Sequence, residues 1–438
     1  MTAENEIHRR IKKRGVITFA EFMELALYWP GGGYYAKDEN PIGPSGDFYT
    51  SPLSHPAFGS LISLQLFQMW ILMGRPESFT VVELGAGNGL LCRDLVKYSK
   101  NLPDNFPETL RYICLDVDSR SGFEKELPAS SESPTISRLA AGAYGWGPSD
   151  LHVGLPLAKF HGCILSNELL DALPVHQAVL QGGRLLESYV TCEHGELAIV
   201  YDEPSTPKLQ QRLDELDLKL SEGQTVEICL GLTNWAKMVS ESMEAGFVLT
   251  VDYGRKAQEL YSNQDRARGT LTTFHQHTQT DAPLQRIGAQ DITAQVDFTS
   301  VINEGMKYAL TPIGYSTQSE FLINLGIRRW QRDLTRMKIS QSEANANRAG
   351  MADLVRHGGL GDFKVLAQSK GLEDLPLWGF QTNVRPSELE LILKSLPPPL
   401  MGPDHLKVNQ GWNLGGELQV DQLWPLPTAS SRDQDETL

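Results

Sequence analysis

Cysteine is scarce in this sequence, which has five cysteines in 438 residues. Their number is odd, and no two of them have the C-x-x-C spacing of redox and zinc sites. We therefore expect neither a disulfide framework nor a structural zinc site, and we expect a reducing compartment. The five cysteines are Cys92, Cys114, Cys163, Cys192 and Cys229.

Long apolar runs and an excess of positive charge are also missing. No apolar stretch reaches the roughly 18 residues that a membrane span requires. The chain has 54 acidic residues against 39 Lys and Arg, for a net charge of −15. Binding to nucleic acid or to anionic membranes rewards clustered Lys and Arg, so neither partner is expected. The first six residues include Glu4 and Glu6 and resemble neither a signal peptide nor a transit peptide.

Short apolar runs bounded by glycine alternate with helical stretches in the middle of the chain. This alternation predicts an α/β fold with a mostly parallel, Rossmann-like sheet and helices on both faces. An antiparallel pair is expected within 185–201, turned at His194 and Gly195. The strands expected in the parallel sheet are 81–84, 112–115, 162–165 and 247–251.

A glycine-rich loop follows the first of these strands and precedes a helix. Its sequence is Glu83-Leu84-Gly85-Ala86-Gly87-Asn88-Gly89. Glycines are needed where a ligand lies against the backbone, because a Cβ would occupy its space. The carboxyl ends of the strands form the ligand crevice of an open α/β sheet, and this loop falls there.

The spacing of these glycines discriminates between cofactors. A dinucleotide fingerprint needs its third glycine at position 90, which is Leu90, and no G-K-[ST] follows as in a P-loop. The pattern instead fits S-adenosylmethionine (SAM), held by Gly85, Gly87 and Gly89, with Glu83 on the ammonium side through water. The next strand ends at Asp116, whose carboxylate can accept both ribose hydroxyls; Asp118 is the alternative.

Five sequence blocks resemble the MidA family, which is typified by a mitochondrial SAM-dependent arginine methyltransferase that helps assemble respiratory complex I. The blocks occur in the family's order, and the resemblance covers roughly residues 7–380. Ala86 and Asn88 stand where the family often has Pro and Arg, and Leu53 replaces its usual Glu. The blocks are GDFYTSP from Gly46, SNELLDALPVH from Ser166, DYG from Asp252, GTL from Gly269 and DITAQVDF from Asp291.

The resemblance implies a class I SAM methyltransferase acting on an arginine of a protein substrate. It implies a bacterial cytoplasmic or a eukaryotic mitochondrial matrix location. A guanidinium is protonated at neutral pH, and carboxylates can hold it in a bidentate grip. The candidate carboxylates are Asp47, Glu168 and Asp171, the last two sharing a face if their segment is helical. Asn167 is expected near the cofactor and the transferred methyl group. For Asn167 and Asp171, the alternative role is capping of a helix after the strand.

Two other functions remain open at this level: methylation of a different protein or small-molecule nucleophile, and a SAM-binding assembly factor without catalysis. No metal is expected, because the pair His275 and His277 lacks further ligands nearby. The expected segments are an N-terminal helical segment with a Gly-rich lid loop (1–75), the SAM-binding core (76–275), a mainly helical accessory subdomain (276–370), a part completing the core (371–427) and a disordered tail (428–438).

The glycine loop is open to a direct test. A Val side chain at position 87 would collide with the bound cofactor, so Gly87→Val should abolish SAM binding while the fold persists. Calorimetry would measure binding, and circular dichroism would check folding. Unchanged SAM affinity in a folded Gly87→Val protein would refute the cofactor site.

Overall fold

The computed structural model describes most of the chain. The described residues are 1–36, 49–116, 155, 157–262, 267–275, 278–373, 376–381, 386–402 and 405, together with the backbone of 135–140. The lid loop at 37–48, the C-terminal tail, Asp47, Asp118 and His277 lie outside these ranges.

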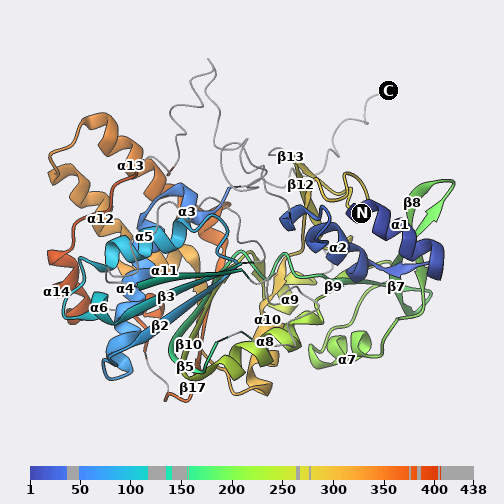
Figure 1. The fold of residues 1–438 in the computed structure, drawn as a ribbon, viewed down its shortest axis with the longest axis horizontal. Coiled ribbons are helices and arrows are strands. Elements are labelled where there is room, and N and C mark those ends of the chain that lie inside the picture. Colours follow the sequence, from blue (N-terminus) through green and yellow to red (C-terminus); the bar gives the residue numbers. More distant parts are fainter. Residues whose placement is uncertain are drawn as a thin grey trace, which may run out of the picture.

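A seven-stranded sheet forms the centre of the molecule (Figure 1). Its strand order is β16-β17-β10-β5-β2-β3-β4. The five strands from β10 to β4 are parallel, and β17 runs antiparallel between β10 and β16. The expected mostly parallel α/β sheet is thus confirmed. The strands are β2 Phe79–Leu84, β3 Leu110–Asp116, β4 Thr135–Ala140, β5 Phe160–Asn167, β10 Met243–Asp252, β16 Thr311–Thr317 and β17 Lys364–Lys370.

Both faces of this sheet are buried, because its strands are apolar at successive positions. Val81 and Val82 belong to different core clusters, one on each face. The helices α4 (Ala57–Leu72), α5 (Leu90–Ser99) and α11 (Gln318–Leu325) cover one face. The helices α8 (Gly231–Ser242) and α10 (Phe298–Lys307) cover the other.

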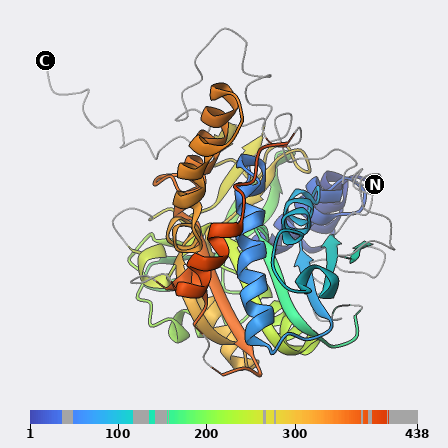
Figure 2. The ribbon, with the colours of Figure 1, turned by 90° about the vertical axis from the view of Figure 1, so that its left-hand side faces the viewer.

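Helix α4 is buried on every side from Ala57 to Trp70. It lies between the sheet and the C-terminal helices, which Figure 2 shows beside it in orange and red. These are α12 (Ile327–Asp333), α13 (Gln341–Asp353) and α14 (Ser387–Ser395). None of the helices among the described residues is long and apolar enough to cross a membrane.

An antiparallel sheet of five strands combines the N-terminal β1 with four strands inserted between β5 and β10, and we call it the inserted sheet. Its β7–β8 hairpin turns at His194 and Gly195, both with positive φ, as expected from the sequence. The strands are β1 Ile17–Thr18, β6 His176–Gln181, β7 Arg184–Glu193, β8 Glu196–Asp202 and β9 Thr225–Ile228. Smaller sheets join β12 Thr272–His275 to β13 Thr278–Thr280 and β14 Asp291–Thr293, and β11 Gly254–Arg255 to β15 Val296–Asp297.

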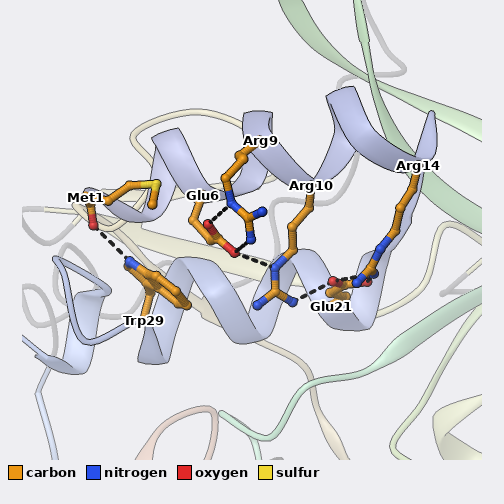
Figure 3. A network of polar contacts seen from close by, with 7 residues as sticks. All are labelled: Met1, Glu6, Arg9, Arg10, Arg14, Glu21 and Trp29. Carbon is orange, nitrogen blue, oxygen red and sulfur yellow. Dashed lines mark hydrogen bonds and ion pairs between the residues drawn. The ribbon is translucent and has the colours of Figure 1, made fainter.

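Two N-terminal helices, α1 (Ala3–Arg14) and α2 (Phe19–Tyr28), pack against this inserted sheet. The Thr18 hydroxyl caps α2 by accepting the Glu21 N–H at 3.1 Å. Figure 3 shows the ionic network that joins the helices: Arg10 bridges Glu6 and Glu21, at 2.8 and 2.6 Å. Hydrogen bonds from Arg9 and Arg10 lower the pKa of Glu6 to about 2, so Glu6 stays charged at neutral pH.

The range 276–370 differs from the expected mainly helical subdomain. It contains helices near the expected positions, but it also supplies β16 and β17 to the central sheet. The apolar residues of 375–382 also suggest a late strand from the sequence, and this prediction is wrong: the described part of the range holds a short 3-10 turn, Trp378–Phe380. Trp378 and Leu377 pack into the core from this turn, so their apolar character reflects burial of side chains and not strand pairing.

The inserted sheet is linked to the core by charges. Helix α7 (Lys208–Glu215) contributes Arg212, which donates to the Glu304 carboxylate of α10 at 2.7 Å. Both side chains are nearly inaccessible to water, with 7% and 1% exposed. Lys307, which is 46% exposed, reaches Glu304 and Glu215 at 2.8 and 3.0 Å. Removal of Glu304 would leave the buried Arg212 with the more distant carboxylate of Glu215, at 3.7 Å.

We expect Glu304→Gln to lower the free energy of unfolding by about 3 kcal/mol, because Arg212 would stay buried beside a neutral group. The matched control Lys307→Met removes an exposed partner of the same carboxylate and should cost at most about 1 kcal/mol. Urea unfolding measures both. If both variants lost the same small amount of unfolding free energy, water would have to reach the Arg212–Glu304 pair.

Candidate active site

The glycine loop connects β2 to α5 where the strand order of the sheet reverses, between β2 and β5. Gly85, Gly87 and Gly89 have φ values of +72°, +52° and +72°, a region that favours glycine. The Gly85 N–H donates to the Leu115 carbonyl at 2.8 Å, which ties the loop to the end of β3. A Cβ at Gly85 would lie 3.0 Å from Leu169 Cδ1, so the loop also packs against the segment that follows β5.

Asp116, the last residue of β3, contacts the same loop. Its Oδ2 accepts the Gly87 N–H at 2.6 Å. The sequence-predicted carboxylate and glycines are therefore brought together at the carboxyl edge of the sheet. A backbone of glycines beside a carboxylate fits a cofactor that carries a ribose and a small zwitterion.

Glu83 lies deeper than the loop. It is 3% exposed, and its Oε2 accepts the Tyr112 hydroxyl at 2.8 Å. Burial, followed by the Glu83 charge, raises the pKa of Tyr112 well above its usual value. Glu83 thus sits inside the sheet, beneath the loop, and Tyr112 is a partner that sequence reasoning missed.

The segment after β5 carries the predicted polar residues, but it is not helical. Glu168 has a φ of +52°, and its N–H donates to the Val251 carbonyl at 2.9 Å, so the chain turns sharply there. The expected helical face shared by Glu168 and Asp171 is absent for this reason. Asn167 Nδ2 donates to Glu168 Oε1 at 2.9 Å. Its Oδ1 is buried without a hydrogen-bond partner among the described residues.

Asp252, at the end of β10, holds this turn in place. It is fully buried, and its Oδ2 accepts the N–H groups of Leu169 and Leu170 at 3.1 and 2.8 Å. Its Oδ1 accepts the N–H of Tyr253 at 2.8 Å. Burial raises the pKa of Asp252 to about 7. Asp252 ends the strand beside β5, and this position is a sequence signal for the site that was not used to predict it.

Four carboxyl groups gather at this edge of the sheet, and we call Glu168, Asp171, Asp252 and Asp291 the acidic cluster. Burial, then the charges of Asp252 and Asp291, raises the pKa of Glu168 to about 8. Burial and the other three carboxylates raise the pKa of Asp171 well above its usual value. The raised pKa values show that these carboxyl groups disfavour one another's ionisation, and a bound cation would relieve this repulsion by favouring the carboxylate form.

The N-terminal segment contributes two tyrosines beside the acidic cluster. Tyr35, in the 3-10 turn Tyr34–Ala36, donates to Asp291 Oδ1 at 2.9 Å. Tyr28, at the end of α2, donates to the Ala172 carbonyl at 2.8 Å. Their rings stack with centroids 5.5 Å apart. Within the described ranges, no group of three or more His, Cys, Asp or Glu side chains is arranged to hold a metal ion.

The sheet order, the glycine loop and the adjacent carboxylate define a class I SAM methyltransferase. A model of the family described as "Putative S-adenosyl-L-methionine-dependent methyltransferase" matches residues 61–316. The chain belongs to this family, and SAM is its cofactor. The resemblance to the MidA family found in the sequence is thereby confirmed.

Known proteins share much of the chain. "Protein arginine methyltransferase NDUFAF7, mitochondrial" from Homo sapiens is 28% identical over 338 residues, which are 73% of this chain and 72% of that protein. The homologue from Caenorhabditis elegans is 29% identical over 344 residues, covering 74% and 76%. A crystal structure of a COG1565 superfamily member from Burkholderia thailandensis, bound to S-adenosyl-homocysteine, has a TM-score of 0.74 and 26% identity. It covers 88% of this chain and 96% of its own.

The raised pKa of Glu168 has a consequence for stability. The unfolded chain ionises this carboxyl near pH 4.5 and the folded chain near pH 8, so stability falls as the pH rises between these values. Glu168→Gln should therefore be more stable than wild type at pH 8, by roughly 1–3 kcal/mol. The difference should vanish near pH 4.5 in thermal or urea unfolding. Exposed Glu320→Gln is the control, and a pH-independent effect of Glu168→Gln would contradict the assignment.

Proposed function

We propose that this protein is a protein arginine N-methyltransferase. The observation that carries the proposal is the acidic cluster, which lies at the ends of β5 and β10 beside the turn that packs on the glycine loop. A methyl donor on that loop would lie near carboxyl groups that a cationic nucleophile would bring into their charged form, so the site suits such a nucleophile. The printed names of the relatives support the same reaction.

The cofactor residues follow from the same geometry. We assign Gly85, Gly87 and Gly89 to the backbone cradle of SAM and Asp116 to its ribose hydroxyls. We assign Glu83, whose Oε2 accepts the Tyr112 hydroxyl, to the ammonium side of SAM through water. Bound SAM supplies an electrophilic methyl group on a sulfonium. Methyl transfer then needs alignment of the attacking nitrogen, and good orientation is worth roughly 7–11 kcal/mol.

The carboxylates have two tasks in this reaction. Glu168 and Asp171 would grip the planar guanidinium, with Asn167 beside it at the end of β5. The nitrogen forms its new bond to the methyl carbon, the carbon–sulfur bond breaks, and one N–H proton must leave. Burial raises the pKa of Glu168 to about 8, and a bound guanidinium would favour its carboxylate form, which can then accept that proton.

The proposed substrate is a protein, and the family resemblance makes a subunit of respiratory complex I the first one to examine. The proposed location is accordingly the mitochondrial matrix for a eukaryotic source and the cytoplasm for a bacterial one. The target can be sought without assumption: lysate from cells that lack the gene is incubated with the purified protein and tritiated SAM. Mass spectrometry then identifies the methylated residue.

We expect Glu168→Gln to retain most of its SAM affinity and to lose most methyl transfer, because the amide keeps the shape and removes the charge. The same result is expected for Asp47→Asn, which rests on the family resemblance. Glu320→Gln, an exposed acid on α11, should transfer methyl normally.

Three results would overturn the proposal. Label on a residue other than arginine would move the reaction to a different nucleophile. Normal transfer by both Glu168→Gln and Asp47→Asn would make these carboxylates structural. A wild-type protein that binds SAM and labels no protein would favour a small-molecule substrate or a binding role.

A further inference from the structure

We infer that Asp291 and the stacked pair Tyr28 and Tyr35 form one wall of the substrate subsite, and that this wall selects a guanidinium over other side chains. The inference rests on the proposed function and extends it, because it assigns substrate selection to residues outside the methyltransferase core strands. Neither the glycine loop nor the turn after β5 contains these three residues.

The wall is assembled from segments far apart in the sequence. Asp291 begins β14 and is 3% exposed. The Tyr35 hydroxyl donates to it at 2.9 Å, and the Tyr28 hydroxyl reaches the carbonyl of Ala172, the residue after Asp171. The aromatic pair therefore borders the acidic cluster directly, through Asp291 and through the residue that follows Asp171.

Electrostatic interactions place Asp291 within this site. Its charge raises the pKa of Glu168, Asp171 and Tyr28. The charge of Asp116, the carboxylate at the glycine loop, also raises the pKa of Tyr28. Tyr28 thus lies near both the acidic cluster and the proposed ribose site, and its hydrogen bond to the Ala172 carbonyl joins it to the turn after β5.

A second observation points to a missing ligand. Asn167 Oδ1 is buried and has no hydrogen-bond partner in the described part of the chain, although its Nδ2 is bound to Glu168. A buried acceptor without a donor is costly, at about 1–3 kcal/mol. A guanidinium carries five N–H donors and no acceptor, so it can satisfy this oxygen and the neighbouring carboxylates together.

The aromatic faces account for selection between cations. A guanidinium is planar and weakly hydrated, so it stacks on a tyrosine ring while its edge donates to carboxylates. An ammonium is compact and strongly hydrated and gains less from a stacked ring. A carboxylate next to a tyrosine pair therefore favours arginine over lysine.

The scaffold of the N-terminal segment holds the wall in position. The Arg10 network ties α1 to α2, whose last residue is Tyr28 (Figure 3). Trp29, the next residue, donates its indole N–H to the Met1 carbonyl at 2.9 Å. Because both ends of α1 are fastened, Tyr28 is presented by a preorganised pair of helices.

The test uses small probes with the full-length protein saturated with S-adenosyl-homocysteine. The probes are Nα-acetyl-arginine amide, its neutral isostere Nα-acetyl-citrulline amide and Nα-acetyl-lysine amide, and ligand-observed NMR measures their Kd values. Wild type should prefer arginine over citrulline. Asp291→Asn should lose about tenfold of this preference and keep its S-adenosyl-homocysteine affinity within about twofold. Asp281→Asn, an exposed acid in the same segment, is the matched control.

A tyrosine variant tests the aromatic face. Tyr28→Leu should weaken arginine binding more than lysine binding, so that the preference between the two cations shrinks severalfold. Thermal unfolding confirms that each variant is folded. If Asp291→Asn fails to fold, Asp291→Glu replaces it; this variant keeps the charge and should keep the preference for arginine over citrulline. If Tyr28→Leu fails to fold, Tyr28→Phe replaces it; this variant keeps the ring and should keep the preference for arginine over lysine.

The outcomes separate this inference from the proposed function. Equal losses of arginine and citrulline binding in Asp291→Asn would mean a purely structural residue and would overturn the inference. A wild type without arginine preference would overturn it as well. If the Asp291→Asn protein still selects arginine and methylates it, the proposed function stands and the inference fails. If the wild type selects arginine but methylates none, the proposed reaction is refuted and the subsite stands.

Discussion

The site depends on one buried carboxylate, Asp252. Its three hydrogen bonds to backbone N–H groups hold the turn after β5 against the end of β10. They act together with the bond from the Glu168 N–H to the Val251 carbonyl, which supports the positive φ of Glu168. An acid that is itself unfavourable in a dry environment is retained there because it satisfies three backbone donors.

Three parts of the chain meet at this turn. The central sheet supplies the glycine loop and the ends of β5 and β10, the small sheet supplies Asp291, and the N-terminal helices supply the two tyrosines. Ionic links stiffen two regions around the site: Arg10 joins α1 to α2, and Arg212 joins α7 to α10. The helix that ends at Tyr28 is thus held by charges that the acidic cluster does not include.

The sequence predicted the features that depend on neighbouring residues. The glycines, Asp116 and the parallel sheet followed from a local pattern, and the structure brings Asp116 and Gly87 within 2.6 Å. Asp252 carried a signal, since it ends a predicted strand, but its contact with the turn after β5 and the meeting of Asp291 with Tyr35 depend on pairing between distant segments. The helical spacing of Glu168 and Asp171 was misleading, since tertiary hydrogen bonds to Asp252 override local helical preference.

The position of β17 affects how the chain is made. Strand β10 lies inside the sheet, yet its partner on one side is β17, which follows long after it in the sequence. During synthesis, one edge of β10 stays unpaired until β17, which ends at residue 370, has left the ribosome. Such long-range pairing is slow, and the waiting edge favours contact with other nascent chains. The fold therefore makes its own biosynthesis a stage at which chaperones matter, and shorter products of the gene would be prone to aggregate.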